Sequence, residues 1–142
     1  MKALIDTCVI LDAIQSRKPF ARDAEAIFLA ASVMQFDGFV TAKAMTDIFY
    51  LSHRLTHDAV LARSIAGRIA ELFGILDTAG EDILEALASD RTDFEDAVMI
   101  ETAVRERMDC IVTRNLRDFA GAPMTVLSPE QFLEAVSGEA RT

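Results

Sequence analysis

The sequence predicts a single α/β domain with three layers, α/β/α, built around a parallel sheet of about five strands. Short apolar runs with strand character alternate with longer segments of helical periodicity, and this alternation is typical of a parallel sheet covered by helices on both faces. The chain has 142 residues, of which 51% are hydrophobic, and we find no repeat or linker in it. One domain over residues 1–142 with one packed core is therefore expected.

The strand candidates are short apolar runs that separate the helical segments. Lys2–Asp6 (KALID) ends at an aspartate, and Gly38–Thr41 (GFVT) follows a turn pair, Asp37-Gly38. The other three candidates are Gly74–Asp77, Asp109–Thr113 and Met124–Leu127. In parallel sheets of this kind, ligands bind at the carboxyl ends of the strands, so the residues that follow the strands are the first candidates for a site.

Helices are predicted where apolar residues recur with a period of three to four. Two segments show this best: Phe20–Gln35, with Ala24, Ile27, Phe28 and Ala31 on one face, and Phe94–Arg107, with Ala97, Ile100, Ala103 and Val104 inward. Further helices are expected at Ala42–Leu55, Asp58–Phe73, Glu81–Ala88 and Ser128–Ala135.

Two of these helices begin with the pattern of a capping box, in which a hydroxyl at the cap and an acid or amide three residues later satisfy each other's backbone N–H groups. In the first, Thr92 is expected to be the cap and Glu95 to reach back to it. In the second, Ser128 and Gln131 have these roles, and Pro129 takes the first helical position.

Charge and composition restrict the possible functions. The net charge of −9 argues against a broad electrostatic grip on nucleic acid, although acidic clusters that hold metal ions contribute such charge. No apolar run is long enough to span a membrane, and the start lacks the features of a secretory signal, so a cytoplasmic protein is expected. The two cysteines, Cys8 and Cys110, form no CxxC pair and are expected to be buried and reduced. His53 and His57 have no third zinc ligand.

Acidic residues occur at the positions where a site is expected. Asp6 directly follows an apolar strand, where a carboxylate needs solvation, hydrogen bonds or a metal ion, although Asp6 and Thr7 can also cap the next turn. Asp93 and Asp96 are three residues apart and share a face near a helix N-terminus. Acids in a first helical turn also complement the helix dipole, so a structural role remains open for both.

Two further regions supply oxygen atoms. Thr113, Asn115 and Asp118 follow the fourth strand, where an ordinary loop with an Asx turn is the alternative. Asp47 lies in a mostly apolar helix, where a solvated position explains it almost as well as a site does. Taken together, these carboxylates would converge at one carboxyl-end cleft, and a few carboxylates suffice to bind Mg²⁺ because this ion keeps several of its waters.

The same segments resemble the PIN-domain family and, within it, the VapC-type toxins of toxin–antitoxin modules. LIDTCVILD is similar to the family's opening strand and turn, whose first acid maps to Asp6. VTAKAMTDIFYL resembles the segment of the second acid, which maps to Asp47. DFEDAVMIETAVRERMDCIVTRNLRDF is the most telling match and maps the third acid to Asp96 and the final Thr-x-Asp/Asn pair to Thr113 and Asn115. The ending VLSPEQFLEAV is also typical of the family.

The resemblance implies a PIN-like fold and a ribonuclease that depends on Mg²⁺ or Mn²⁺ and hydrolyses single-stranded RNA. It implies catalytic roles for Asp6, Asp47, Asp96 and Asn115, metal ligands among Asp6, Asp93, Asp96, Asn115 and Asp118, and support from Thr7 and Thr113. Two positions depart from the family pattern, because the second acid is usually Glu rather than Asp47 and the fourth position is often Asp rather than Asn115. The departures favour an alternative, a PIN-fold binding module with a weakened site that recognises RNA or a protein without cleavage.

The resemblance also implies partners. Toxins of this type form homodimers and are inhibited by an antitoxin that wraps the toxin. The dense apolar run Ile48–Leu51 exceeds what one helix face buries, so part of it is expected at a dimer interface; burial of the helix between neighbours of the same chain is the alternative. Five basic residues are candidates for phosphate contacts at the cleft mouth: Arg17, Lys18, Arg22, Arg114 and Arg117. A phosphatase would need Asp-x-Asp after the first strand, where the chain has Asp6-Thr7-Cys8, and a receiver-like domain would need an acidic pair there.

Overall fold

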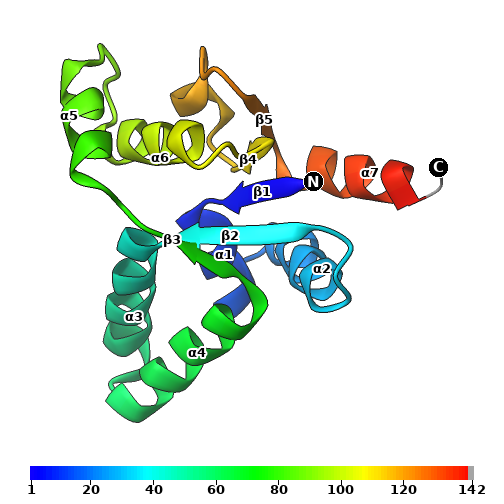
Figure 1. Ribbon diagram of the computed structural model, residues 1–142. Coiled ribbons are helices and arrows are strands. Elements are labelled where there is room, and N and C mark those ends of the chain that lie inside the picture. The colour runs from blue at the N-terminus through cyan, green and yellow to red at the C-terminus, as the bar shows by residue number, and fades with distance from the viewer. Residues whose placement is uncertain (141–142) are drawn as a thin grey trace.

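A parallel five-stranded sheet forms the middle layer of the computed structural model, which describes residues 1–140 (Figure 1). The strand order is β3-β2-β1-β4-β5, and each neighbouring pair is parallel. The strands are β1 (Lys2–Ile5), β2 (Asp37–Thr41), β3 (Gly74–Leu76), β4 (Cys110–Val112) and β5 (Thr125–Leu127). The predicted three-layer α/β/α fold is therefore confirmed, with every strand within two residues of its expected position.

The helices of the described residues connect these strands. They are α1 (Thr7–Ile14), α2 (Ala21–Ser32), α3 (Ala42–Thr56), α4 (Ala59–Leu72), α5 (Gly80–Ala88), α6 (Phe94–Arg105), the 3-10 helix η1 (Leu116–Phe119) and α7 (Pro129–Ala140). Helix α1 was not predicted. Its sequence, TCVILDAI, is apolar on most sides and buries Val9, Ile10 and Leu11, so it lacks the polar face from which an amphipathic helix is identified.

Successive residues of a strand point to opposite faces of the sheet, and this alternation separates two cores. Ala3 and Ile5 of β1 belong to the larger core, which is formed with side chains of α1, α2, α3, α4 and α7. Leu4 belongs to the smaller core on the other face, with Ile100 of α6 and Phe119 of η1. In Figure 1, α5 and α6 accordingly lie together on one side of the sheet, away from α2 and α4.

The helix starts and faces agree with the sequence in most respects. The second capping box is confirmed, because the Ser128 N–H donates to Gln131 Oε1 (2.9 Å) and the Gln131 N–H donates to Ser128 Oγ (3.2 Å). The first predicted capping box is wrong, because Asp93, not Thr92, caps α6. The predicted inward position of Val104 is also wrong, since its side chain is 44% exposed. It lies near the end of α6, past the part of the helix that the core covers.

The sequence predicted two buried cysteines, and the structure confirms this for one. Cys110 of β4 is buried, whereas Cys8 of α1 is half-buried, and both are free of disulfides. Among residues 1–140, no helix combines the length and the apolar composition that crossing a membrane requires.

The strand order determines where a site can form. From the central strand β1, the chain builds β2 and then β3 on one side, and it returns to place β4 on the other side of β1. Connections leave β1 and β4 in opposite directions along the sheet, which opens a crevice at the carboxyl ends of these two strands. Asp6 directly follows β1, and Thr113 directly follows β4.

Candidate metal centre

Asp6 is held at the carboxyl end of β1 by its neighbours. Its backbone opens α1, but its side chain makes no capping bond, so the alternative that Asp6 merely caps this turn is wrong. Instead, Oδ2 accepts hydrogen bonds from Thr113 Oγ1 (2.7 Å) and from the Cys8 thiol (3.3 Å). Burial raises the pKa of the Asp6 carboxyl, and these two hydrogen bonds oppose the rise.

Three further aspartates form a group beside it. The Asp93 carboxylate caps α6 by accepting the Asp96 N–H (3.0 Å), and this bond places Asp96 in the first helical turn. Asp118 comes from η1, the short helix after β4. One carboxylate oxygen of each of the three residues lies within 4.8 Å of the others. The structure therefore brings together two predicted regions, the start of α6 and the loop after β4.

The environment of this group disfavours the charged form of Asp96. Its pKa is raised to about 7, first by burial and then by the negative charges of Asp6, Asp93 and Asp118. A carboxylate at a helix N-terminus is ordinarily favoured by the helix dipole, so here burial and repulsion outweigh that effect. Asp96 therefore keeps its proton to a higher pH than an ordinary aspartate does.

This arrangement fits a hard divalent cation. Asp6, Asp93, Asp96 and Asp118 offer carboxylate oxygens, the ligands that Mg²⁺ and Mn²⁺ prefer. In the described part of the chain, none of these four carboxylates forms an ion pair with Lys, Arg or His. A cation that neutralised the group would relieve the repulsion that raises the Asp96 pKa.

A cavity of about 670 Å³ opens beside the acids, between α3, α5 and α6. Its lining includes Asp6, Thr7, Asp47 and Asp96, four of the residues predicted from the sequence. A second cavity of about 440 Å³ adjoins the group from the other side and is lined by Asp93, Asp118 and Arg117, among others. The acidic group is thus accessible from two sides.

Asp47 lies on the cavity wall, but its charge is already compensated. Lys43 Nζ lies 2.5 Å from Asp47 Oδ2, one helical turn away on α3, and 3.0 Å from Glu95 Oε1 on α6. Lys43 thereby connects two walls of the cavity. We did not predict this pairing from the sequence. A lysine four residues before an aspartate on a helix is nevertheless a signal that could have predicted it.

Thr113 and Asn115 have different positions. The Thr113 hydroxyl is buried; it donates to Asp6 and accepts the Asn115 N–H at 3.0 Å. The Asn115 side chain is exposed. Through its backbone, Asn115 supports the threonine that orients Asp6.

The predicted phosphate-binding arginines are in part used elsewhere. Arg114 Nε donates to Asp12 Oδ2 at 2.5 Å, and its guanidinium lies 4.0 Å from the centre of the Phe20 ring. Arg17 also lies within 3.9 Å of Asp12. Asp12 is buried on α1, and a buried carboxylate needs such partners. Of the five basic candidates, Arg117 is the one that lines a cavity next to the acidic group.

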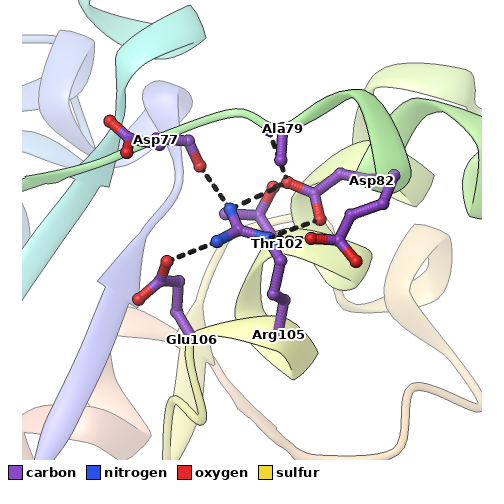
Figure 2. A network of polar contacts seen from close by, with 7 residues as sticks. Asp77, Ala79, Asp82, Thr102, Arg105 and Glu106 are labelled. Atoms are coloured by element: carbon purple, nitrogen blue, oxygen red, sulfur yellow. Dashed lines mark hydrogen bonds and ion pairs between the residues drawn. The ribbon is translucent and has the colours of Figure 1, made fainter.

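A second acidic cluster, centred on Asp82, contacts the C-terminal half of α6 (Figure 2). The buried Asp82 of α5 accepts hydrogen bonds from Arg105 Nε (2.9 Å), from Thr102 Oγ1 (2.9 Å) and from the Ala79 N–H (2.9 Å). Arg105 also donates to the Asp77 carbonyl (2.6 Å). These bonds lower the pKa of Asp82 against the effect of burial. The network fixes the segment 77–82, which contributes Thr78 to the wall of the 670 Å³ cavity.

Known structures share this fold. A toxin–antitoxin complex from Klebsiella pneumoniae contains a chain that is 22% identical with a TM-score of 0.66, over 89% of this chain and 97% of that one. VapBC bound to DNA from Salmonella typhimurium gives 16% identity and a TM-score of 0.67, over 91% and 98%. VapBC2 from Rickettsia felis, bound to a DNA fragment from its promoter, gives 16% and 0.64, over 90% and 98%.

Sequence comparison identifies a family for this chain but no individual curated relative. No curated protein matches the chain. The sequence model of the PIN domain matches residues 2–117, which include β1, the acidic group except Asp118, and Asn115. This match covers most of the chain, and the chain therefore belongs to the PIN domain family.

Proposed function

We propose that this protein is an endoribonuclease that depends on Mg²⁺ or Mn²⁺ and hydrolyses phosphodiester bonds of single-stranded RNA. The observation that carries the proposal is the group of carboxylates without cationic partners at the carboxyl ends of β1 and β4. Asp6 and Asp96 of this group are buried, whereas Asp93 and Asp118 are exposed. Buried carboxylates without a cationic partner are unfavourable for folding alone, and a divalent ion is a partner that fits them. Membership in the PIN domain family supports the same reading.

The residues divide the work as follows. Asp6 and Asp96 would hold the ion, with Asp93 and Asp118 at its other side, and Thr113 keeps the Asp6 carboxylate in place through its 2.7 Å hydrogen bond. When bound, a divalent ion supplies Lewis acidity, which lowers the pKa of water and neutralises charge on the phosphodiester. Asp47 joins the site if Lys43 releases it, and Asn115 supports Thr113 from the rim.

We further propose that the chain is the toxin of a toxin–antitoxin module and forms a homodimer. The support is the fold shared with chains of toxin–antitoxin complexes over about nine tenths of the molecule. The apolar run on α3 gives weaker support than the sequence suggested, because Ile48 is buried in its own core and Tyr50 alone is exposed. Light scattering at micromolar concentration tests the dimer, and growth arrest on expression in bacteria tests the toxin.

The decisive experiment compares Asp6→Asn and Asp96→Asn with the original protein. Each change removes a charged ligand at nearly constant shape, so metal-dependent cleavage of single-stranded RNA should be lost while circular dichroism shows an intact fold. Glu134→Gln, an exposed carboxylate on α7 away from both cavities, is the matched control and should cleave normally. Equal cleavage by Asp96→Asn and Glu134→Gln would refute the assignment.

One alternative has its own observation. Asp47 is neutralised by Lys43, and Asn115 brings no charge to the acidic group, so two of the four expected catalytic positions are weakened. Both favour a PIN-fold binding module that recognises RNA or a protein without cleavage. A titration with Mg²⁺ and Mn²⁺ distinguishes the two functions, because a binding module produces no cleavage at any metal concentration.

A further inference from the structure

The aromatic side chains of this protein are unevenly distributed. The sequence has nine phenylalanines, one tyrosine and no tryptophan, and three of these rings are exposed: Phe20, Tyr50 and Phe94. Phe20 is covered on one face by the Arg114 guanidinium. Tyr50 of α3, 68% exposed, and Phe94 at the start of α6, 44% exposed, both line the 670 Å³ cavity that also contains Asp6 and Asp96. Both uncovered exposed rings of the described chain therefore stand beside the acids.

The rest of the cavity suits a flat, mainly apolar ligand. Leu51, Ile83 and Val98 contribute apolar lining, and the volume is within the range of roughly 300–1,000 Å³ that small-molecule sites occupy. Thr78, also in the lining, has a buried hydroxyl oxygen without a hydrogen-bond partner. A nucleobase offers ring faces for the aromatic side chains and edge donors and acceptors for such a hydroxyl.

The charge of the protein makes contacts of this kind necessary for an RNA ligand. At a net charge of −9, the chain cannot hold a nucleic acid through a broad basic surface. Stacking of bases on aromatic rings does not depend on the charge of the protein and is the usual complement to phosphate contacts on single strands. Arg54, on the same cavity wall, has no ion-pair partner among the described residues and is available to a phosphate.

We propose that this cavity is a subsite for one unpaired nucleobase, which stacks on Tyr50 and Phe94 while Arg54 contacts its phosphate. The proposal deepens the proposed nuclease function and rests on it for its biological meaning, because the subsite would present the neighbouring phosphodiester to the acidic group. It also gives a structural reason for a single-stranded substrate: bases of a duplex are paired and stacked and cannot enter the cavity.

Tyr50 provides a direct test, because it is the only tyrosine and the chain has no tryptophan. The intrinsic fluorescence of the protein therefore reports on this one ring. Titration with a short single-stranded oligoadenylate, in Ca²⁺ to screen the acidic group, should quench this fluorescence, and a gel run afterwards checks that the strand is intact. The same sequence annealed into a duplex should produce little quenching.

Variants measure the contribution of each ring through the anisotropy of a labelled strand. Tyr50→Leu and Phe94→Leu should each weaken binding by roughly five- to a hundred-fold, the usual effect of losing one stacked base. Tyr50→Phe keeps the ring and should bind like the original protein. Weaker binding by Tyr50→Phe would assign the effect to the hydroxyl instead of the ring. Phe20→Leu, at the exposed ring outside the cavity, is the matched control and should leave the affinity unchanged.

The outcomes separate this inference from the nuclease proposal. Quenching and ring-dependent binding without any metal-dependent cleavage would support the base subsite and refute the nuclease. Cleavage that is unaffected by Tyr50→Leu and Phe94→Leu, at subsaturating RNA, would refute the subsite and leave the nuclease standing. An oligonucleotide that neither quenches Tyr50 nor binds would also overturn the inference.

Discussion

Two acidic clusters contact α6, and they differ in their partners. Asp82 is surrounded by donors from Arg105, Thr102 and the Ala79 N–H, and its pKa is lowered. Asp96 has other carboxylates as neighbours, and its pKa is raised to about 7. A buried carboxylate with enough hydrogen-bond donors and a cationic partner contributes to the stability of the fold. A buried carboxylate beside other carboxylates is unfavourable in its charged form, and the rest of the fold must hold it there. The Asp82 cluster is thus complete in itself, whereas the Asp96 cluster has no ion-pair partner among the described residues.

The largest effect is expected from breaking the satisfied cluster. Asp82→Ala leaves the guanidinium, hydroxyl and N–H donors of Figure 2 without their acceptor, so the free energy of unfolding should fall by about 3–4 kcal/mol. Urea denaturation measures this loss. Asp96→Asn is the counterpart and should leave the metal-free protein as stable or more stable at pH 8, because it removes a repelled charge. Equal destabilisation by both changes would contradict the distinction between the clusters.

The pH dependence of stability should have opposite signs for the two clusters. A carboxyl whose folded pKa is raised from 3.8 to about 7 binds protons better in the folded state, so its contribution to stability is lost as the pH rises through that interval. For Asp96 the loss should approach about 2–4 kcal/mol, at about 1.4 kcal/mol per unit of pKa. Asp82, with a lowered pKa, loses its contribution only as the pH falls below about 4. Thermal melts of metal-free protein between pH 4 and 8, repeated with Asp96→Asn, would reveal the difference.

Divalent metal should stabilise the protein through the Asp96 cluster alone and not through the Asp82 cluster. An ion that binds the folded site stabilises the protein by mass action, by about 2.7 kcal/mol at a hundred times its dissociation constant. Millimolar Mn²⁺ should therefore raise the melting temperature of the original protein and should also reduce the pH dependence described above. Asp96→Asn should lose most of this response, while Glu134→Gln should keep it. A melting temperature that ignores Mg²⁺ and Mn²⁺ in the original protein would exclude the metal site.

The smallest effect is expected from a change at Asn115, on the rim of the acidic site. Asn115→Asp adds a carboxylate at the position where the PIN-domain pattern often has one, so metal should bind a few-fold more tightly and cleavage should rise or stay level. The change leaves the N–H that donates to Thr113 in place, so the orientation of Asp6 should persist. Isothermal titration with Mn²⁺ measures the affinity. Weaker metal binding by Asn115→Asp would show that this side chain points away from the ion.

The sequence predicted the fold and the acids well because both depend on local signals. Strand ends and a helix start are readable over a few residues, and Asp6, Asp93, Asp96 and Asp118 lie at such positions. The raised pKa of Asp96 is a consequence of this convergence, because the charges of Asp6, Asp93 and Asp118 contribute to it.

The sequence could not predict pairings that depend on tertiary structure. The ion pairs of Asp12 with Arg114 and of Lys43 with Glu95 join residues 102 and 52 positions apart, and no local pattern specifies such partners. For the same reason, two arginines expected at phosphates turned out to neutralise a buried acid.

The hydrogen bond between Thr113 and Asp6 spans 107 positions of the chain. During synthesis, Asp6 leaves the ribosome well before its partner on the distant segment after β4 has been made. Chains that stop before β4 lack Asp118, one of the four acids, and Thr113, which orients Asp6, whatever else they have folded. At a synthesis rate of roughly 5–20 residues per second, Asp6 therefore lacks its hydrogen-bond donor Thr113 for at least several seconds while the chain is made.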